Sequence, residues 1–277
     1  MDSSLLLGIT TFAYLVSAVI YIALFVFRVP RLGLVATAAT AVALAVNTGG
    51  IILRWVESHQ MGIGYAPLSN MYESLVFFSW SIAVFYLGLE YLYKNRYLGA
   101  FAMPFAALAM ILAELKNPAI RPLVPALQSN WLIAHVVTCF IGYAAFAVAC
   151  GFGVVYLLKY RKKNSGVSSP LLDQLPDLAV LDDIMHKTLL FGFLWLSVGI
   201  ITGAVWANSA WGTYWSWDPK ETWSLITWFI YAAALHARFT RGWGGRKISW
   251  FSIIGFVSVM FTYYGVNYLL SGLHSYG

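Results

Sequence analysis

An eleven-residue segment combines aromatic, acidic and basic side chains between two strongly apolar stretches. Residues 211–221 read Trp-Gly-Thr-Tyr-Trp-Ser-Trp-Asp-Pro-Lys-Glu, with rings at Trp211, Tyr214, Trp215 and Trp217. Such rings are apolar but end in one polar atom, so they suit the depth where a membrane meets water. An ordinary interfacial belt explains any single Trp. This density, with Gly212 allowing close backbone approach, favours a platform for a large flat apolar ligand.

The end of the same segment predicts the start of a helix. Asp218 is placed as the N-cap, Pro219 as the first helical residue, and Glu221 three residues after the cap closes a capping box. Two interpretations of Asp218 and Glu221 stay open. They cap the helix only, or they cap it and also contact a ligand.

Three of the five histidines are candidates for metal ligation. His236 lies about fifteen residues beyond Glu221, roughly 20 Å along a helix, which places it inside a membrane span. An ionisable residue at that depth indicates function. His135 lies one turn into the fifth apolar segment and, taken alone, fits a hydrogen-bonded interfacial residue. His274 is near the end of the sequence, and its position alone assigns it no role.

The other histidines and both cysteines have simpler interpretations. His59 falls in a Gly-containing loop and His186 at the end of the long polar stretch, so both are expected to be solvated or at headgroup level. Cys139 and Cys150 share one predicted helix, and their spacing fits neither a redox pair nor a metal site. We expect both cysteines to be small core residues.

The composition indicates a polytopic membrane protein of the all-α class. The chain is 60% hydrophobic and 10% charged, with a mean hydropathy of +0.73, which excludes an ordinary soluble domain. A span needs about 20 apolar residues. Eight segments meet this requirement, roughly 5–27, 33–55, 72–93, 97–114, 131–158, 187–207, 222–240 and 248–271. Because the connections are short, we expect one helix bundle and a single domain over 1–277.

The basic residues predict the orientation of this bundle. A formal charge of +6 would suggest nucleic acid as a partner of a soluble protein, but here most of the 17 Lys and Arg residues fall at alternate connections. Those connections, including the loop 159–186, are expected on the cytoplasmic side. Both termini and the tryptophan-rich loop 208–221 are then outside, and no nucleic-acid role is expected. The first apolar segment lacks a basic leader, so it is expected to be a retained helix.

Another helix start is predicted further upstream. In the stretch Pro67–Leu75, Ser69 or Asn70 is a plausible cap, and Glu73 falls in the first turn, where the helix dipole favours an anion. Capping explains this stretch adequately.

The run WGTYWSWDPKETWSLITW resembles the tryptophan-rich WWD signature of the haem-handling cytochrome c assembly family. Both this run and Pro67–Leu75 look most like its System II synthase branch, typified by CcsA (ResC). The resemblance implies a membrane protein that moves haem b and presents it, reduced, on the outer face. There it is joined by thioether bonds to the Cys-x-x-Cys-His segment of apocytochrome c. It also implies a CcsB (ResB)-like membrane subunit as partner, and thiol-reducing proteins.

The resemblance further implies roles for particular residues. His135 and His274 match the two external ligands of the haem iron, and His236 matches an intramembrane ligand whose opposing histidine comes from the partner subunit. The tryptophan-rich loop would hold the haem on the outer face. The implied catalytic set is His135, His274, Trp211, Trp215, Trp217 and Asp218, and the implied haem-binding set adds His236, Gly212 and Tyr214.

Other functions remain to be weighed against this one. A haem-binding exporter or regulator of the HemX-like or CcmC-like branches would form no thioether bonds. A b-type electron-transfer cytochrome needs histidine pairs at matched depths, and only the external pair, His135 and His274, meets this requirement. A secondary transporter predicts internal repeats or helices broken at mid-membrane, and the sequence shows neither clearly. We expect an integral protein in contact with lipid, either of the bacterial cytoplasmic membrane or of the thylakoid.

Overall fold

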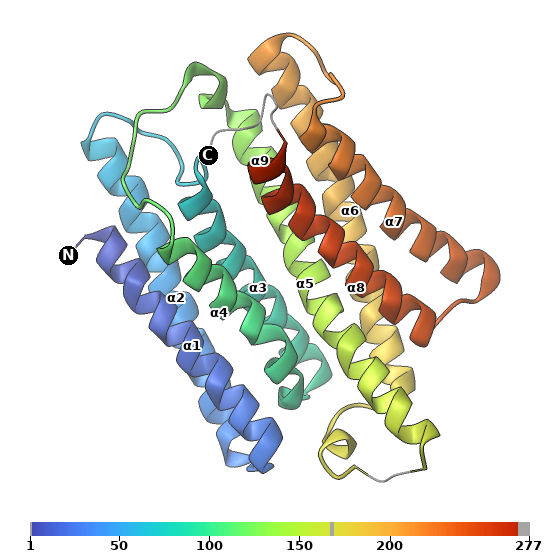
Figure 1. Cartoon of the computed structure of the whole chain (residues 1–277). Coiled ribbons are helices and arrows are strands. Elements are labelled where there is room, and N and C mark those ends of the chain that lie inside the picture. The colour runs from blue at the N-terminus through green and yellow to red at the C-terminus, as the bar shows by residue number, and fades with distance from the viewer. Residues whose placement is uncertain (1, 167–168, 271–277) are drawn as a thin grey trace. The chain divides into compact units, whose positions relative to one another are not determined.

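The computed structural model describes residues 2–166 and 169–270 (Figure 1). Within these residues every regular element is helical and no strand is present, which confirms the all-α prediction. The packing divides the chain into two compact units. Unit 1 consists of Met1–Leu123 with Ser168–Pro176, and unit 2 of Val124–Val167 with Asp177–Gly277. That both act as one domain stays a prediction.

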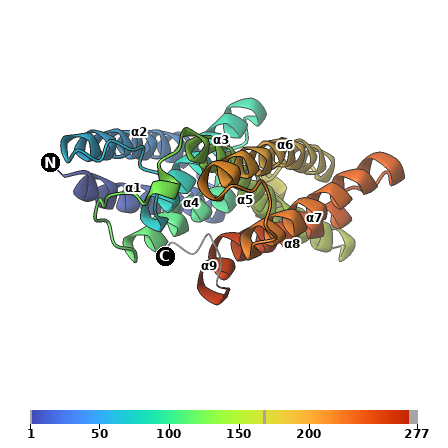
Figure 2. The same cartoon turned by 90° about the horizontal axis from the view of Figure 1, so that it is seen from above.

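Unit 1 is built from antiparallel helices joined by short connections. Its described elements are α1 (Ser3–Phe27), α2 (Arg31–Gln60), α3 (Met71–Tyr93), η1 (Arg96–Leu98), α4 (Gly99–Glu114) and η3 (Leu172–Gln174). Helix α1 packs against α2 and α4, and α3 packs against the same two helices, as Figure 2 shows from above. Tyr21 and Tyr86 are buried in this unit and donate to the buried carboxylate of Glu90 at 2.5 and 2.8 Å. Buried polar groups need such partners.

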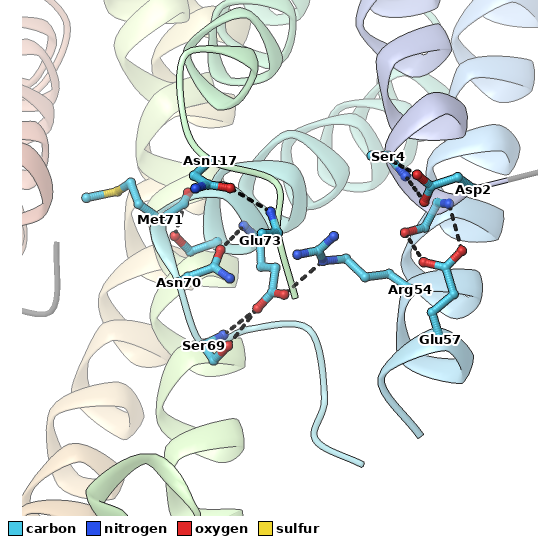
Figure 3. A network of polar contacts seen from close by, with 12 residues as sticks. Asp2, Ser4, Arg54, Glu57, Ser69, Asn70, Met71, Glu73 and Asn117 are labelled. Atoms are coloured by element: carbon cyan, nitrogen blue, oxygen red, sulfur yellow. Dashed lines mark hydrogen bonds and ion pairs between the residues drawn. The ribbon is translucent and has the colours of Figure 1, made fainter. Parts of the chain in front are cut away.

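The start of α3 is held by side chains of the predicted stretch Pro67–Leu75. Asn70 is the N-cap, and its side-chain oxygen accepts from the Glu73 backbone N–H at 2.9 Å. The Glu73 carboxylate accepts from the Ser69 backbone N–H at 2.9 Å and pairs with Arg54 Nε at 2.8 Å (Figure 3). The predicted cap is confirmed. Glu73 and Arg54 are both buried, so each charge compensates the other.

Unit 2 contains the tryptophan-rich segment. Its described elements are η2 (Pro125–Leu127), α5 (Asn130–Asn164), α6 (Leu178–Trp211), α7 (Pro219–Arg241), α8 (Arg246–Met260), the π-helical turn η4 (Phe261–Gly265) and α9 (Val266–Leu269). Helix α5 lies between α6 and α8, and α7 packs against both α6 and α8 (Figures 1 and 2). Helices α5 and α7 begin, and α6 and α9 end, at the same end of this unit (Figure 1).

Glycines let α5 and α6 approach each other closely. A Cβ atom added to Gly142 would lie 3.0 Å from the Gly192 carbonyl oxygen, and one added to Gly199 would lie 2.6 Å from Cys139 Sγ. Small residues at such contacts allow tight packing of membrane helices, which do not gain from burying apolar surface as soluble helices do. Both cysteines are buried, as expected of core residues.

Most of the described helices are suited to cross a membrane. Among the described residues, seven are long and apolar enough: α1, α2, α3, η1 with α4, α5, α6, and α8 continued through α9. Helix α7 has 23 residues, about 35 Å at 1.5 Å per residue, but it also carries His236 and several charged groups. Its length therefore suffices for the predicted span 222–240, while its composition is less apolar than that of the others.

The helices on either side of the predicted cytoplasmic loop are longer than expected. Helix α5 continues to Asn164 and α6 begins at Leu178, so the connection between them, which contains η3, is shorter than the predicted loop 159–186. Lys and Arg are good helix formers and need no burial, so they extend α5 beyond the apolar part of the span.

Candidate functional site

The capping box predicted at the start of α7 is present. Asp218 Oδ2 accepts from the Lys220 backbone N–H at 3.1 Å. Glu221 Oε2 reaches back to the Asp218 backbone N–H at 3.2 Å and to the Ser216 backbone N–H at 2.8 Å. Asp218 is buried, at 6% exposure. The two acids thus fix the direction in which the loop enters α7.

The loop itself places its rings in two groups. Helix α6 ends at Trp211 because Gly212 adopts a left-handed φ of 80°. Trp211 packs edge-on against Trp206 with ring centroids 5.1 Å apart, whereas Trp215 and Trp217 form a second edge-to-face pair at 5.7 Å. Trp217 is 68% exposed, and Tyr214, at 60%, is exposed as well. The exposed rings offer apolar contact surface at the end of unit 2.

Trp217 has a backbone conformation that is unusual for its residue type. Its φ is 60°, in the left-handed region that L-residues with a Cβ avoid. Such a conformation costs about 1–3 kcal/mol and persists only where the surrounding structure holds it. The capping box that follows immediately is such a constraint.

His135 is oriented by α6. Its Nδ1 lies 2.8 Å from the carbonyl oxygen of Gly199, and its ring lies nearly parallel to that of Trp206, with a centroid distance of 5.9 Å and an interplanar angle of 14°. A carbonyl can only accept, so Nδ1 carries the hydrogen and Nε2 carries the lone pair. A backbone carbonyl that fixes the tautomer in this way is the usual arrangement for a metal-ligating histidine.

Two further residues on α6 contribute to the surroundings of His135, and sequence reasoning missed both. A Cβ atom on Gly203 would lie 2.6 Å from His135 Nδ1, so only glycine fits there. Trp206 is 2% exposed and donates through Nε1 to the Ala126 carbonyl at 2.9 Å. Gly199, Gly203 and Trp206 are spaced as i, i+4 and i+7, so they lie on one face of α6. This spacing is the sequence signal that could have identified them.

Lys220 also belongs to this end of unit 2. Its Nζ donates to Asn267 Oδ1 at 2.8 Å, and Asn267 Nδ2 donates to the Tyr263 carbonyl at 2.9 Å. Lys220 precedes the predicted span 222–240. Burial lowers the pKa of its ammonium to about 8, and the nearby Asp218 carboxylate opposes this shift. Nothing in the sequence indicated that Lys220 is withdrawn from water, because its partner is 47 residues away.

The chain segment beside Lys220 contains a π-helical turn. Residues Phe261–Gly265 form this turn, and the Phe261 ring lies 4.2 Å from that of Trp223 on α7. Thr262 Oγ1 donates to the Trp223 carbonyl at 3.3 Å. Turns of this kind are rare and are often found at functional sites.

Comparison with known proteins identifies the family. The profile of the cytochrome c assembly protein family matches residues 68–274, which is most of the chain and includes the whole loop. The chain belongs to this family. Similar proteins include the cytochrome c biogenesis protein CcsA of Gloeobacter violaceus, 39% identical, covering 90% of this chain and 88% of the relative. The protein of the same name from Guillardia theta is 42% identical, over 84% of this chain and 83% of the relative.

A solved structure shares the fold. The cytochrome c haem lyase CcmF superposes with a TM-score of 0.70 over 95% of this chain, at 17% sequence identity. The chain spans 46% of the length of that structure. This likeness supports the arrangement of helices, while the residues of the site are argued from this chain alone.

Within unit 2 of this cytochrome c assembly protein, His236 is placed apart from the loop. His236 is exposed on α7, and its side chain makes no hydrogen bond, ion pair or ring contact with the residues that the structure describes. Arg238, two residues further, is paired with Asp182, with Nη1 and Oδ2 2.7 Å apart. His236 thus lies toward the opposite end of unit 2 from the loop, as its place in the sequence predicted.

The other histidine predictions have mixed outcomes. His186 lies inside α6 with its ring edge against Phe239 at 5.4 Å, so it is not a loop residue. It was misplaced because helix α6 begins nine residues before the predicted span 187–207. His59 was predicted in a loop, which is wrong: α2 continues to Gln60 rather than ending near residue 55, so His59 lies in its last turn, with Nδ1 2.9 Å from the Trp55 carbonyl. His274, the predicted second external ligand, lies outside the described residues.

Proposed function

We propose that this chain is the haem-presenting subunit of a cytochrome c synthase. It holds reduced haem b on the outer face of the membrane, through His135 and His274, for attachment to the Cys-x-x-Cys-His segment of apocytochrome c. Membership of the cytochrome c assembly family and the names of the relatives support this role. The observation that carries it is the hydrogen bond from His135 Nδ1 to the Gly199 carbonyl. Because Nδ1 is used in this bond, Nε2 is the nitrogen that would ligate the haem iron.

The loop supplies the apolar part of the site. A haem is a large flat apolar ring, and the exposed rings of Tyr214 and Trp217 with the partly buried Trp215 offer surface of matching character. Trp206 stacked on His135 fixes the orientation of the axial ligand. The loop rings would hold the haem by its flat apolar surface, and His135 would hold it along the axis of the iron–nitrogen bond.

Positioning is then the main catalytic device. In thioether formation each cysteine thiol adds across one haem vinyl group: a sulfur–carbon bond forms, and the thiol proton ends on the other vinyl carbon. No net oxidant or reductant is consumed by this addition. When the protein holds the vinyl groups and the thiols in reacting geometry, a bimolecular reaction becomes effectively unimolecular. This change accelerates the step strongly.

His236 is assigned to the entry of haem. Its exposed position on α7 leaves room for a haem and for an opposing histidine from a CcsB (ResB)-like subunit. Haem would pass from this level to the outer site. The membrane is bacterial cytoplasmic or thylakoid, with the active face extracytoplasmic or lumenal, and thiol-reducing proteins keep the apocytochrome cysteines available.

The visible spectrum of the complex with its CcsB-like partner tests the ligand assignment. Two axial histidines give low-spin haem, so His135→Ala should lower the low-spin fraction of outer-site haem, and added imidazole should restore it. His59→Ala is the matched control, since its Nδ1 also bonds a backbone carbonyl. An unchanged spectrum of His135→Ala would remove His135 from the site.

A further inference from the structure

Lys220 is a partly buried cation at the end of unit 2 that carries the tryptophan-rich loop, and the haem-ligand assignment gives it no role. The Lys220 ammonium has three donors, but among the described residues Asn267 Oδ1 is the one acceptor within hydrogen-bond distance. Asn267 is neutral, so it satisfies a donor without compensating the charge. A charged group withdrawn from water is costly unless it meets an opposite charge.

The nearest carboxylate is already engaged in another role. Asp218 Oδ2 accepts from the backbone N–H of Lys220 rather than from its ammonium, and no ion pair joins the two side chains in the part of the chain that the structure describes. Glu221 likewise binds backbone N–H groups of Ser216 and Asp218. The acids therefore hold the loop, and the ammonium keeps donors for another acceptor.

Lys220 lies on the His135 side of unit 2. Helix α7 begins with Lys220, and α9 with its partner Asn267 ends, at the end of the unit where α5 begins with His135 in its second turn (Figure 1). The ammonium, the axial ligand and the loop rings thus come from α5, α6, α7 and α9 at one end of the unit. A ligand held by His135 and the loop would bring its own polar groups near Lys220.

We propose that Lys220 is a positioning residue that binds a carboxylate of the porphyrin substrate. This inference rests on the proposed function, in which haem is the substrate. Haem carries its two propionates on the edge opposite its two vinyl groups. An axial histidine alone leaves the ring free to turn about the iron–nitrogen bond. An ammonium on one propionate stops that rotation and so decides where the vinyl groups face.

The test compares iron protoporphyrin IX with its dimethyl ester, which lacks the carboxylates but keeps the ring and the iron. Binding of each to the complex with the partner subunit is followed by the Soret band. A hydrogen bond to a charged group contributes enough that Lys220→Met should weaken binding of the diacid about tenfold or more. The diester should bind Lys220→Met and wild type equally.

Two variants separate carboxylate binding from a structural role. Lys220→Arg keeps the charge and should retain the preference for the diacid. Asn267→Ala removes the observed partner of Lys220 but keeps the ammonium, so it should also retain the preference. The proposal is overturned if Lys220→Met weakens both porphyrins equally, or if Asn267→Ala loses the preference as Lys220→Met does. Porphyrin binding that does not depend on His135 would instead overturn the proposed function.

Discussion

The Nδ1 atom of His135 on α5 lies 2.8 Å from the carbonyl oxygen of Gly199 on α6. The bond joins two helices across a contact where glycines allow close approach, and it sets both the tautomer and the direction of the imidazole. The acceptor is a backbone carbonyl of a glycine, and a Cβ atom at this position would lie 2.6 Å from Cys139 Sγ. The ligand geometry is therefore built into the packing of α5 on α6.

Gly203→Ala should displace His135 without removing it. The new methyl group would lie 2.6 Å from Nδ1, so the ring or the helix has to shift. We expect overpacking to cost about 1–3 kcal/mol of stability, and the variant to lose low-spin haem as His135→Ala does. The visible spectrum of the purified complex measures this. Gly88→Ala, where an added Cβ meets nothing within 4 Å, is the control and should bind haem like wild type. Normal haem ligation in Gly203→Ala would contradict the orientation argued for His135.

The two interpretations of Asp218 can be separated by two substitutions. All of its hydrogen bonds described above are capping bonds, and Asn caps helices about as well as Asp. Asp218→Asn should therefore keep stability and cytochrome assembly near wild type, whereas Asp218→Ala should lose about 1 kcal/mol. Thermal unfolding and covalent haem on a reporter cytochrome are the two readouts. Loss of product in a stable Asp218→Asn protein would show that the charge itself acts on the ligand.

The preference for haem over its diester should depend on pH. Burial disfavours the charged form of Lys220 and lowers its pKa to about 8, so the ammonium is present below this pH and is lost as the pH rises through it. Within residues 2–166 and 169–270, the charged and titratable neighbours are Asp218, the N-cap of α7, and Cys139 on α5. We expect the preference to fall between about pH 7 and pH 9.5 in wild type. Lys220→Arg should keep it across this range, because guanidinium stays protonated. A wild-type preference that is constant over the range would contradict the role of the ammonium.

Local patterns allowed some of these features to be predicted from the sequence. The order Asp-Pro-Lys-Glu at 218–221 predicts a capping box from neighbouring residues alone, because the bonds join residues three apart or fewer. The cap that Asn70 forms with the Glu73 backbone is predicted in the same way. Apolar length located the helices but not their ends, because charged residues continue a helix into water. His186 was misplaced for this reason.

Long-range pairing could not be predicted in the same way. Lys220 and Asn267 are 47 residues apart, and His135 and Gly199 are 64 apart. Neither pair leaves a local signal, since tertiary packing alone brings them together. The ion pair of Arg54 with Glu73 is a third example: the sequence placed Glu73 in a first turn but not its buried partner.

The most direct test of the central claim is covalent haem on a co-expressed apocytochrome reporter, in cells that supply the CcsB-like partner. We predict that His135→Ala and His274→Ala lose most of the product, that exogenous imidazole restores it by replacing the missing ligand, and that His59→Ala is unaffected. His236→Ala should lose product as well, through failure of haem entry. If His135→Ala attaches haem at the wild-type level, the account of the outer site is wrong. If wild type binds haem but forms no product, the chain is a haem exporter or regulator rather than a synthase subunit.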